Sequence, residues 1–209
     1  MMQEPIDVKS KILSTGIRVG THVKTKFMAP FITMANPDGM YQFDMDITLQ
    51  RIDAAARFMK NVGPENALVC SGREFAYSPI EKFCEITGAQ IKLNRFMPGT
   101  LTNPSLKYYI EPRLILISDP QVDEQAVIEA TNAGIPVIGI ANTDNITSNV
   151  DLVIPANNKG RRALATIYWL LARRILIEQE NLTEDGQMAY EIDDFETKHL
   201  FDESAPITS

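Results

Sequence analysis

Four short runs of apolar, largely branched residues lie between positions 67 and 155, and they restrict the possible folds more than any other feature. They are residues 67–70 (ALVC), 114–117 (LILI), 136–141 (PVIGIA) and 151–155 (DLVIP). Continuous apolar runs are typical of strands buried on both faces, as in parallel sheets, because half-exposed strands alternate apolar and polar residues. The sequence therefore predicts a parallel sheet that is covered on both faces.

Helical patterns lie between and around these runs, and each is bounded by residues that start or stop helices. The predicted helices run from a cap at Asp46 to a stop at Gly63-Pro64, from Pro79 to Gly88, over 126–133 after a cap at Asp123, and over 161–179. Further strands are expected near 41–43 and 90–93. This alternation predicts an α/β fold of three layers, a parallel sheet flanked by helices.

The formal net charge of −7 is unevenly distributed. Residues 178–209 hold ten acids and one base, whereas residues 1–177 hold 19 bases against 17 acids. Residues 8–37 and 152–177 contain no acid, and residues 92–113 hold four bases and one acid. The acidic balance of the whole chain therefore does not exclude a polyanionic partner. We predict a basic N-terminal arm (1–37), an α/β/α domain (38–178) and an acidic tail (179–209).

Several classes of protein are disfavoured by what the sequence lacks. The first residues contain no apolar run resembling a signal-peptide core, and the apolar stretch over 163–172 has about half the length of a membrane span. Cys70 and Cys84 form no CxxC motif, and His22 lies far from His199, so no zinc site is predicted. We expect an intracellular soluble protein without cofactor, metal or membrane partner.

A small-molecule enzyme or sensor is the alternative class. Ligands of open α/β sheets bind beyond the carboxyl ends of the strands, where this chain places Ser71, Asp119 and Asn142. A nucleotide or sugar phosphate would suit such residues. However, the chain has no dinucleotide-binding, P-loop or nucleophile-elbow motif. Because Asx side chains also bond backbone amides in turns, we favour a structural role there and predict no catalytic residue.

The basic regions favour RNA over a small anion. Bases interleaved with aromatic residues, as in the arm and in the long loop over 95–113, suit phosphate contacts combined with stacking on unpaired bases. In PANNKGRRA (155–163), three bases surround the start of a helix, a position that attracts phosphate. Equally, Asn158 caps that helix and the bases form a solvated face. The candidate RNA-binding residues are Arg18, His22, Lys24, Lys26, Arg95, Phe96, Lys107, Arg113, Lys159, Arg161 and Arg162.

Five segments in order carry a resemblance to a known family. They read GTHVKTKFMAPFI, NRFMPGTLTNPS, EPRLILISDPQVDEQAVIEA, GIPVIGIANTDN and VDLVIPANNKGRRA. The set resembles the second small-subunit ribosomal protein family, which includes bacterial ribosomal protein S-two and eukaryotic ribosomal protein SA. PGTLTN and IPANNKG resemble its archaeal and eukaryotic branch most closely. The resemblance covers nearly all of residues 16–178.

The resemblance implies a flavodoxin-like (Rossmann-like) domain that is a non-catalytic constituent of the small ribosomal subunit. Such proteins lie where the head of the subunit meets its body and contact small-subunit rRNA and neighbouring ribosomal proteins. We therefore expect a cytoplasmic, ribosome-bound protein that supports translation and subunit assembly and has no small-molecule substrate. The family's RNA-facing regions correspond to Arg18, His22, Lys24, Lys26, Arg95 and Phe96, and further to Lys159, Arg161 and Arg162.

Two departures from the family pattern limit what is carried over. Bacterial members insert a long helical hairpin, but the interval from Asp46 to Ala67 has room for only one helix. Eukaryotic members have a tryptophan-bearing acidic tail linked to laminin, whereas the only Trp here is Trp169, inside the last predicted helix. We therefore predict neither a hairpin-dependent role nor laminin binding.

The acidic tail has two interpretations. It is either a solvated tail or a segment that docks on a basic neighbouring ribosomal protein through Phe195, Leu200 and Phe201. We also expect the basic arm and the loop over 95–113 to become ordered only on the assembled particle, as disordered basic segments often do.

Overall fold

A parallel sheet of five strands forms the centre of the fold in the computed structural model, which describes residues 12, 14–183, 186 and 188–197. The strands are β3 (Ala67–Ser71), β4 (Gln90–Leu93), β5 (Leu114–Ile117), β6 (Val137–Ala141) and β7 (Leu152–Pro155). Across the sheet they follow the order β4-β3-β5-β6-β7. In chain order this is 2-1-3-4-5, the flavodoxin-like arrangement, so the predicted fold class is confirmed.

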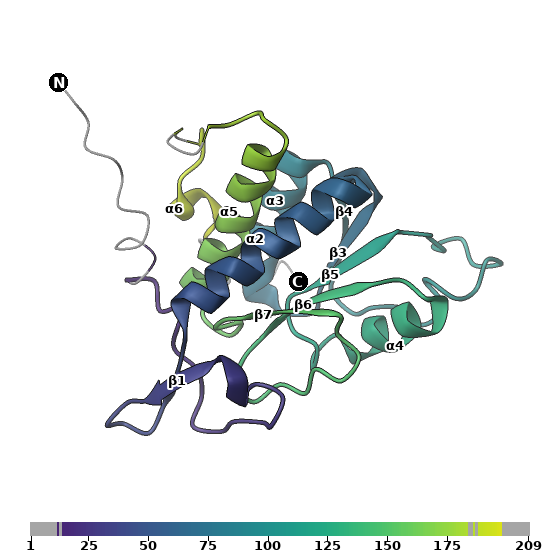
Figure 1. Cartoon of the computed structure of the whole chain (residues 1–209). Coiled ribbons are helices and arrows are strands. Elements are labelled where there is room, and N and C mark those ends of the chain that lie inside the picture. The colour runs from purple at the N-terminus through teal and green to yellow at the C-terminus, as the bar shows by residue number, and fades with distance from the viewer. Residues whose placement is uncertain (1–11, 13, 184–185, 187, 198–209) are drawn as a thin grey trace, which may run out of the picture.

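Helices cover the two faces of the sheet unequally (Figure 1). On one face, α2 (Met45–Val62), α3 (Tyr77–Thr87) and α5 (Arg161–Glu178) pack in the main core with Val69, Leu116 and Ile140 of the strands. On the other face, α4 (Glu124–Ala133) packs on Leu68 and Ile115. Three short 3₁₀ helices also lie before residue 77: η1 (Ala29–Phe31), η2 (Pro64–Asn66) and η3 (Glu74–Ala76).

Burial of the strands follows the sequence pattern. Every residue of β3, β5 and β6 is buried, as the continuous apolar runs predict for the inner strands of a three-layer sheet. The edge strand β4 is partly exposed, and Ile91 on it is 42% exposed. The middle of α5 is buried on most sides, which matches its apolar composition.

Helix starts differ from the sequence prediction in three places. Asp44, not Asp46, caps α2, since its Oδ1 accepts hydrogen bonds from the N–H groups of Asp46 and Ile47. Helix α3 begins at Tyr77, so Pro79 lies within its first turn instead of opening it. Asp123 does stand at the N-cap of α4, but its side chain accepts from the Gly72 N–H and leaves the helix uncapped.

The described part of the predicted arm packs on the domain. Ile12 and Ile17 are buried in the main core. Strand β1 (Ile32–Ala35) pairs antiparallel with β2 (Tyr41–Phe43), so a hairpin spans the predicted boundary at residue 37. A Cβ at Gly20 would lie 2.4 Å from Thr143 Cγ2, which shows how closely the arm approaches the end of β6.

A loop replaces a helix in the connection from β4 to β5. These strands flank β3, so the connection has to cross over β3 on the face that holds α4. Phe96 and Leu101 from this loop are buried with Leu68 and Ile117 of the sheet. The loop thereby supplies the apolar cover that a crossover helix supplies elsewhere.

The chain returns to the main core after α5. We call residues 188–197 the C-terminal segment; it contains α6 (Ile192–Phe195), and the ring of Phe195 is fully buried in the main core. The indole N–H of Trp169 donates to the Tyr190 carbonyl at 2.8 Å, and the Thr197 hydroxyl donates to the Phe75 carbonyl at 3.2 Å. This part of the predicted tail is therefore folded against α3 and α5.

Candidate nucleic-acid interface

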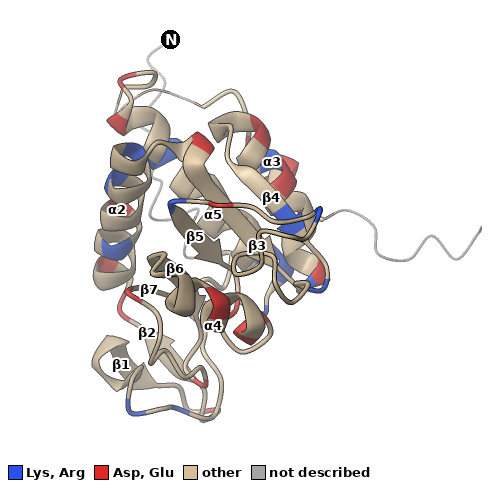
Figure 2. Ribbon diagram, turned by 90° about the vertical axis from the view of Figure 1, so that its right-hand side faces the viewer, with Lys and Arg blue, Asp and Glu red and all other residues tan. Residues whose placement is uncertain are grey.

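The basic arm presents its charges at the end of the molecule that carries β1 and β2 (Figures 1 and 2). His22, Lys24 and Lys26 are exposed, and Arg18 is half-buried. The Lys24 ammonium lies 4.9 Å from the centre of the Tyr41 ring, and Phe27, three positions after Lys24, is 50% exposed. The arm thus combines accessible cations with an accessible ring, the chemistry that single-stranded RNA requires.

Hydrogen bonds to the loop that follows β6 fix the shape of the arm. The Thr21 N–H donates to Thr143 Oγ1 at 2.9 Å, and the Thr25 N–H donates to the Thr143 carbonyl at 2.9 Å. The Thr25 hydroxyl also donates to the Asn145 carbonyl at 2.9 Å. Lys24 and Lys26 flank Thr25, so their backbone positions are set before any partner binds.

The long loop after β4 presents a second group of cations. Arg95, Lys107 and Arg113 are exposed. Phe96, by contrast, is only 6% exposed because it covers the sheet, and no face of its ring is left for a base. We therefore remove Phe96 from the candidate RNA-binding residues.

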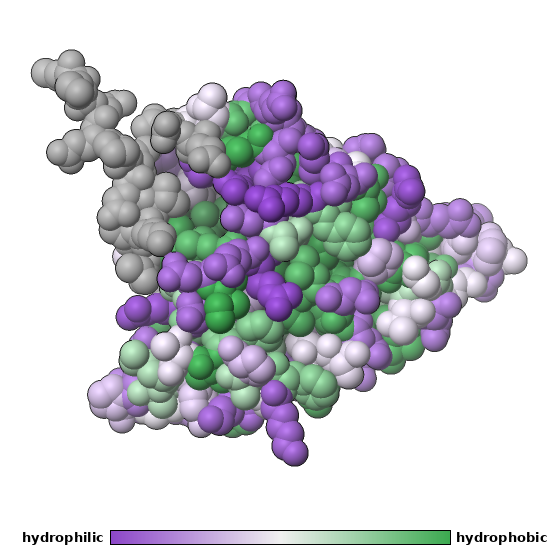
Figure 3. Space-filling view, in the orientation of Figure 1, coloured by the Kyte–Doolittle hydropathy of each residue, from purple (hydrophilic) through white to green (hydrophobic). Residues whose placement is uncertain are grey.

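The same loop carries an exposed aromatic residue that is not among the candidate RNA-binding residues. Tyr108 is 37% exposed, its hydroxyl donates to the Pro98 carbonyl, and the Lys92 ammonium lies 5.9 Å from the centre of its ring. In the sequence, Tyr108 directly follows Lys107, one of the pairs of base and aromatic residue that favour RNA. Figure 1 shows the loop projecting from the side of the molecule, and its surface in Figure 3 is hydrophilic to neutral.

The third group of cations, at the start of α5, is paired within the chain. Arg161 Nε lies 2.8 Å from Glu196 Oε1, and Arg162 lies within ion-pair distance of Asp193 and Glu196. Lys159 pairs with Asp144. The three cations are exposed, whereas Asp144 and Glu196 are half-buried. Solvent screening of the cations limits the stability that these pairs contribute, so RNA phosphates could replace the carboxylates.

The structure contradicts the predicted cap at Asn158. Gly160, not Asn158, is the N-cap of α5. Asn158 is fully buried, and its amide donates to the Ile140 carbonyl at 3.1 Å and to Asn145 Oδ1 at 3.0 Å. Asn157 Oδ1 accepts from the N–H groups of Lys159 and Gly160. Both Asn side chains therefore fix the loop before the helix.

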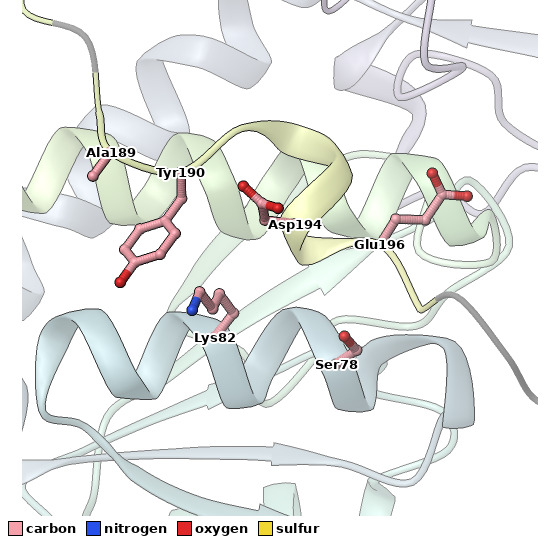
Figure 4. A pocket seen from close by; sticks show the side chains of 6 residues that line it. All are labelled: Ser78, Lys82, Ala189, Tyr190, Asp194 and Glu196. Carbon is pink, nitrogen blue, oxygen red and sulfur yellow. The ribbon is translucent and has the colours of Figure 1, made fainter.

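The C-terminal segment borders a pocket of about 530 Å³ against α3 (Figure 4). It is lined by Ser78, Lys82, Ala189, Tyr190, Asp194 and Glu196. The Lys82 ammonium lies 4.0 Å from the centre of the Tyr190 ring and pairs with Glu85, while Asp194 Oδ2 accepts from the Glu191 N–H. The charged groups of Lys82 and Asp194 are thus engaged by groups of the same chain.

The polar residues at the strand ends are also engaged with one another. Ser71, Asp119 and Asn142 are all buried. Asp119 accepts from the Arg73 guanidinium through Oδ2 and from the Asn145 amide, at 3.0 Å, through Oδ1. Protein groups therefore engage the Asp119 carboxylate at the carboxyl ends of the strands, where a flavodoxin-like enzyme would bind its ligand.

Asp123, next to the strand ends, has a strongly perturbed acidity. Burial, and to a smaller extent the neighbouring Asp119, raises the pKa of its carboxyl to about 7, although the hydrogen bond from the Gly72 N–H opposes this shift. Among the described residues, its Oδ2 atom has no hydrogen-bond partner. Burial likewise raises the pKa of the Cys84 thiol to about 12, as expected for a cysteine that is not a nucleophile.

Among the residues that the structure describes, no group of three His, Cys, Asp or Glu side chains is arranged to hold a metal ion. None of the described helices is both long enough and apolar enough to cross a bilayer.

Comparison with known proteins decides the family. The model of the family described as ribosomal protein S2 matches residues 105–177. Small ribosomal subunit protein uS2 of Nitrosopumilus maritimus is 70% identical over 195 residues, which cover 93% of this chain and 94% of the relative. The chain belongs to the uS2 family of ribosomal proteins. The uS2 protein of Cenarchaeum symbiosum is 55% identical over 92% of this chain and 93% of its own, and that of Saccharolobus solfataricus is 42% identical over 93% and 83%.

Membership of the uS2 family confirms the resemblance seen in the sequence, including its archaeal type. It is a family of ribosomal proteins, which are structural components and not enzymes, and this disfavours the small-molecule enzyme. As expected from the spacing, α2 is the only α-helix between residues 45 and 66 of this uS2 chain, a range that the structure describes completely.

Proposed function

We propose that this uS2 chain is a structural constituent of the small ribosomal subunit, binding small-subunit rRNA and neighbouring ribosomal proteins where the head meets the body. The 70% identity to a small-subunit protein over nearly the whole chain carries the proposal. A ribosome-bound protein of this kind supports translation and subunit assembly without catalysing a reaction.

We assign the rRNA contacts first to the arm and the loop. Their exposed bases are His22, Lys24, Lys26, Arg95, Lys107 and Arg113, with the half-buried Arg18 beside them. Such bases neutralise phosphates and release counterions, which fixes orientation and supplies little sequence readout. Lys159, Arg161 and Arg162 would contact RNA only by exchanging their carboxylate partners for phosphates.

The test is cosedimentation of the chain with small subunits that lack it, over a series of salt concentrations. For the double variant Lys24→Ala/Lys26→Ala, the slope of log affinity against log salt should fall by about 2, because each lost phosphate contact removes about 1. Arg57→Ala/Lys60→Ala removes the same charge from exposed positions on α2 and should leave the slope unchanged. Equal slopes for both double variants and the parent would refute the arm as a contact.

Docking of the acidic tail on a basic ribosomal protein belongs to the same proposal. Leu200 and Phe201 lie outside the described residues, and Phe195 is withdrawn from the docking set because its ring is part of the chain's own core. A chain ending at Gln179 would lose that ring and is unsuitable for a test. A chain ending at Thr197 keeps it. If this shorter chain recovers the same ribosomal proteins as the parent in a pull-down, tail docking is wrong.

A further inference from the structure

Glu129, a buried carboxylate on α4, holds the loop over 95–113 by its backbone. Its Oε1 accepts from the Gly99 N–H at 2.7 Å, and its Oε2 accepts from the Leu101 N–H at 3.1 Å. Oε1 also accepts from the Gln125 side-chain amide at 2.7 Å, and the residue is only 4% exposed. Both oxygens are therefore occupied by groups of the same chain.

Glu129 differs from a carboxylate in an ordinary buried ion pair because backbone amides, not a basic side chain, are its main partners. Within residues 12–183, apart from position 13, no Lys, Arg or His forms an ion pair with it. A buried charged group is costly unless it is hydrogen-bonded, and bonds from N–H groups to a carboxylate are among the stronger ones. The two loop amides thus stabilise the carboxylate, and the carboxylate in turn fixes the loop.

The loop needs such an anchor because it lacks a helical hydrogen-bond ladder. Gly99 has φ +88°, a conformation that strains any residue with a side chain, and its amide is one of the two that Glu129 holds. The Ile110 N–H donates to the Thr100 carbonyl at 2.9 Å and closes the loop. Phe96 and Leu101, on either side of this turn, are fixed in the second core cluster.

The turn that Glu129 holds, residues 99–101, lies between exposed side chains of the loop. Arg95 and Met97 precede it and Lys107 and Tyr108 follow it, and all four are exposed. We propose that Glu129 is a positioning residue, which presets the loop for rRNA through the Gly99 and Leu101 amides and itself contacts no RNA. This inference rests on the proposed function, in which the loop's cations face rRNA.

Charge and geometry predict opposite effects of a mutation at Glu129. Removal of a negative charge near a polyanion would raise affinity if only electrostatics mattered. Glu129→Gln has nearly the same shape but places an amide N–H opposite a backbone N–H, so the loop loses one bond and gains a repulsion. We expect affinity for small subunits to fall about tenfold at every salt concentration, with an unchanged salt slope, because no phosphate contact is lost.

The matched control is Glu124→Gln, which makes the same charge change at an exposed position on the same helix. It should leave affinity equal to or slightly above that of the parent. Hydrogen exchange should show faster exchange of the Gly99 and Leu101 amides in Glu129→Gln alone. Arg95→Ala/Lys107→Ala reports on the loop's contacts and should lower the salt slope by about 2.

The outcomes separate this inference from the proposed function. If Arg95→Ala/Lys107→Ala lowers the slope but Glu129→Gln binds like the parent, the positioning role is refuted and the RNA-binding role stands. A slope unchanged by Arg95→Ala/Lys107→Ala refutes both for this loop. If Glu129→Gln does not fold, Glu129→Asp takes its place in the test. Asp keeps the carboxylate, but its side chain is one methylene shorter, so both oxygens lie farther from the Gly99 and Leu101 amides. Weaker binding at an unchanged slope then supports the inference, and parent-like binding overturns it.

Discussion

Replacing Asp123 with Asn should change how the stability of the fold depends on pH. The carboxyl is 3% exposed and receives a 2.8 Å hydrogen bond from the Gly72 N–H through Oδ1, while Oδ2 has no partner among the described residues. Asn is close in shape to the protonated acid and keeps the Oδ1 acceptor. The variant therefore resembles the protonated form at every pH.

The magnitude follows from the raised pKa. Burial raises the pKa of Asp123 from 3.8 to about 7, so the folded protein retains a proton that the unfolded chain releases near pH 4. The stability from this group is fully present below pH 3.8 and is lost as the pH rises through 7. At about 1.4 kcal/mol per pKa unit the total is about 4 kcal/mol, of which about 2.5 kcal/mol is lost between pH 5 and pH 8.

Urea denaturation of the parent and of Asp123→Asn at pH 5 and pH 8 measures this loss. The difference between the two free energies of unfolding removes the contributions of all other titrating groups. We expect the advantage of the variant over the parent to grow by about 2.5 kcal/mol from pH 5 to pH 8. An advantage that is the same at both pH values would show that Asp123 is ionised in the folded protein throughout this range.

Three further substitutions test other parts of the structure. Phe195→Ala removes a fully buried ring from the main core and should lower the free energy of unfolding by about 3–5 kcal/mol in urea denaturation. Tyr168→Phe leaves the buried Ser118 hydroxyl without its 2.7 Å partner and should cost about 1–2 kcal/mol in the same assay. Glu196→Gln releases the exposed Arg161, so stability should change by at most about 1 kcal/mol, and the salt slope for small subunits should rise by up to about 1.

The sheet was largely predictable because its signal is local. Three of the four apolar runs became fully buried strands, and the fourth, around Ile154, became the partly buried edge strand β7. Strand β1 was missed because its four residues, of which three are exposed, carry no apolar run. The cap of α2 was misplaced by two positions because Asp44 and Asp46 are both good caps, and only the backbone geometry distinguishes them.

The candidate site was less predictable because its properties depend on distant partners. Phe96 next to Arg95 suggested stacking, but the loop replaces a crossover helix and needs that ring against the sheet. The bases of the α5 start suggested a free phosphate site, yet Asp193 and Glu196, about 30 positions later, pair with them. No local pattern reveals a partner that only the tertiary fold brings near.

The burial of Phe195 has a consequence for the order of events during synthesis. Its ring lies in the same core as Ile12 and Ile17, which precede it by more than 170 positions and leave the ribosome before it, so that core takes side chains from widely separated parts of the chain. Domains generally fold as units while the chain emerges N-terminal end first. In a nascent chain that has emerged only through α5, the sheet and the preceding helices are available to pack, but the core lacks the Phe195 ring. Closure of the core must therefore wait until the α6 residues have left the exit tunnel, after the sheet and α5 have emerged.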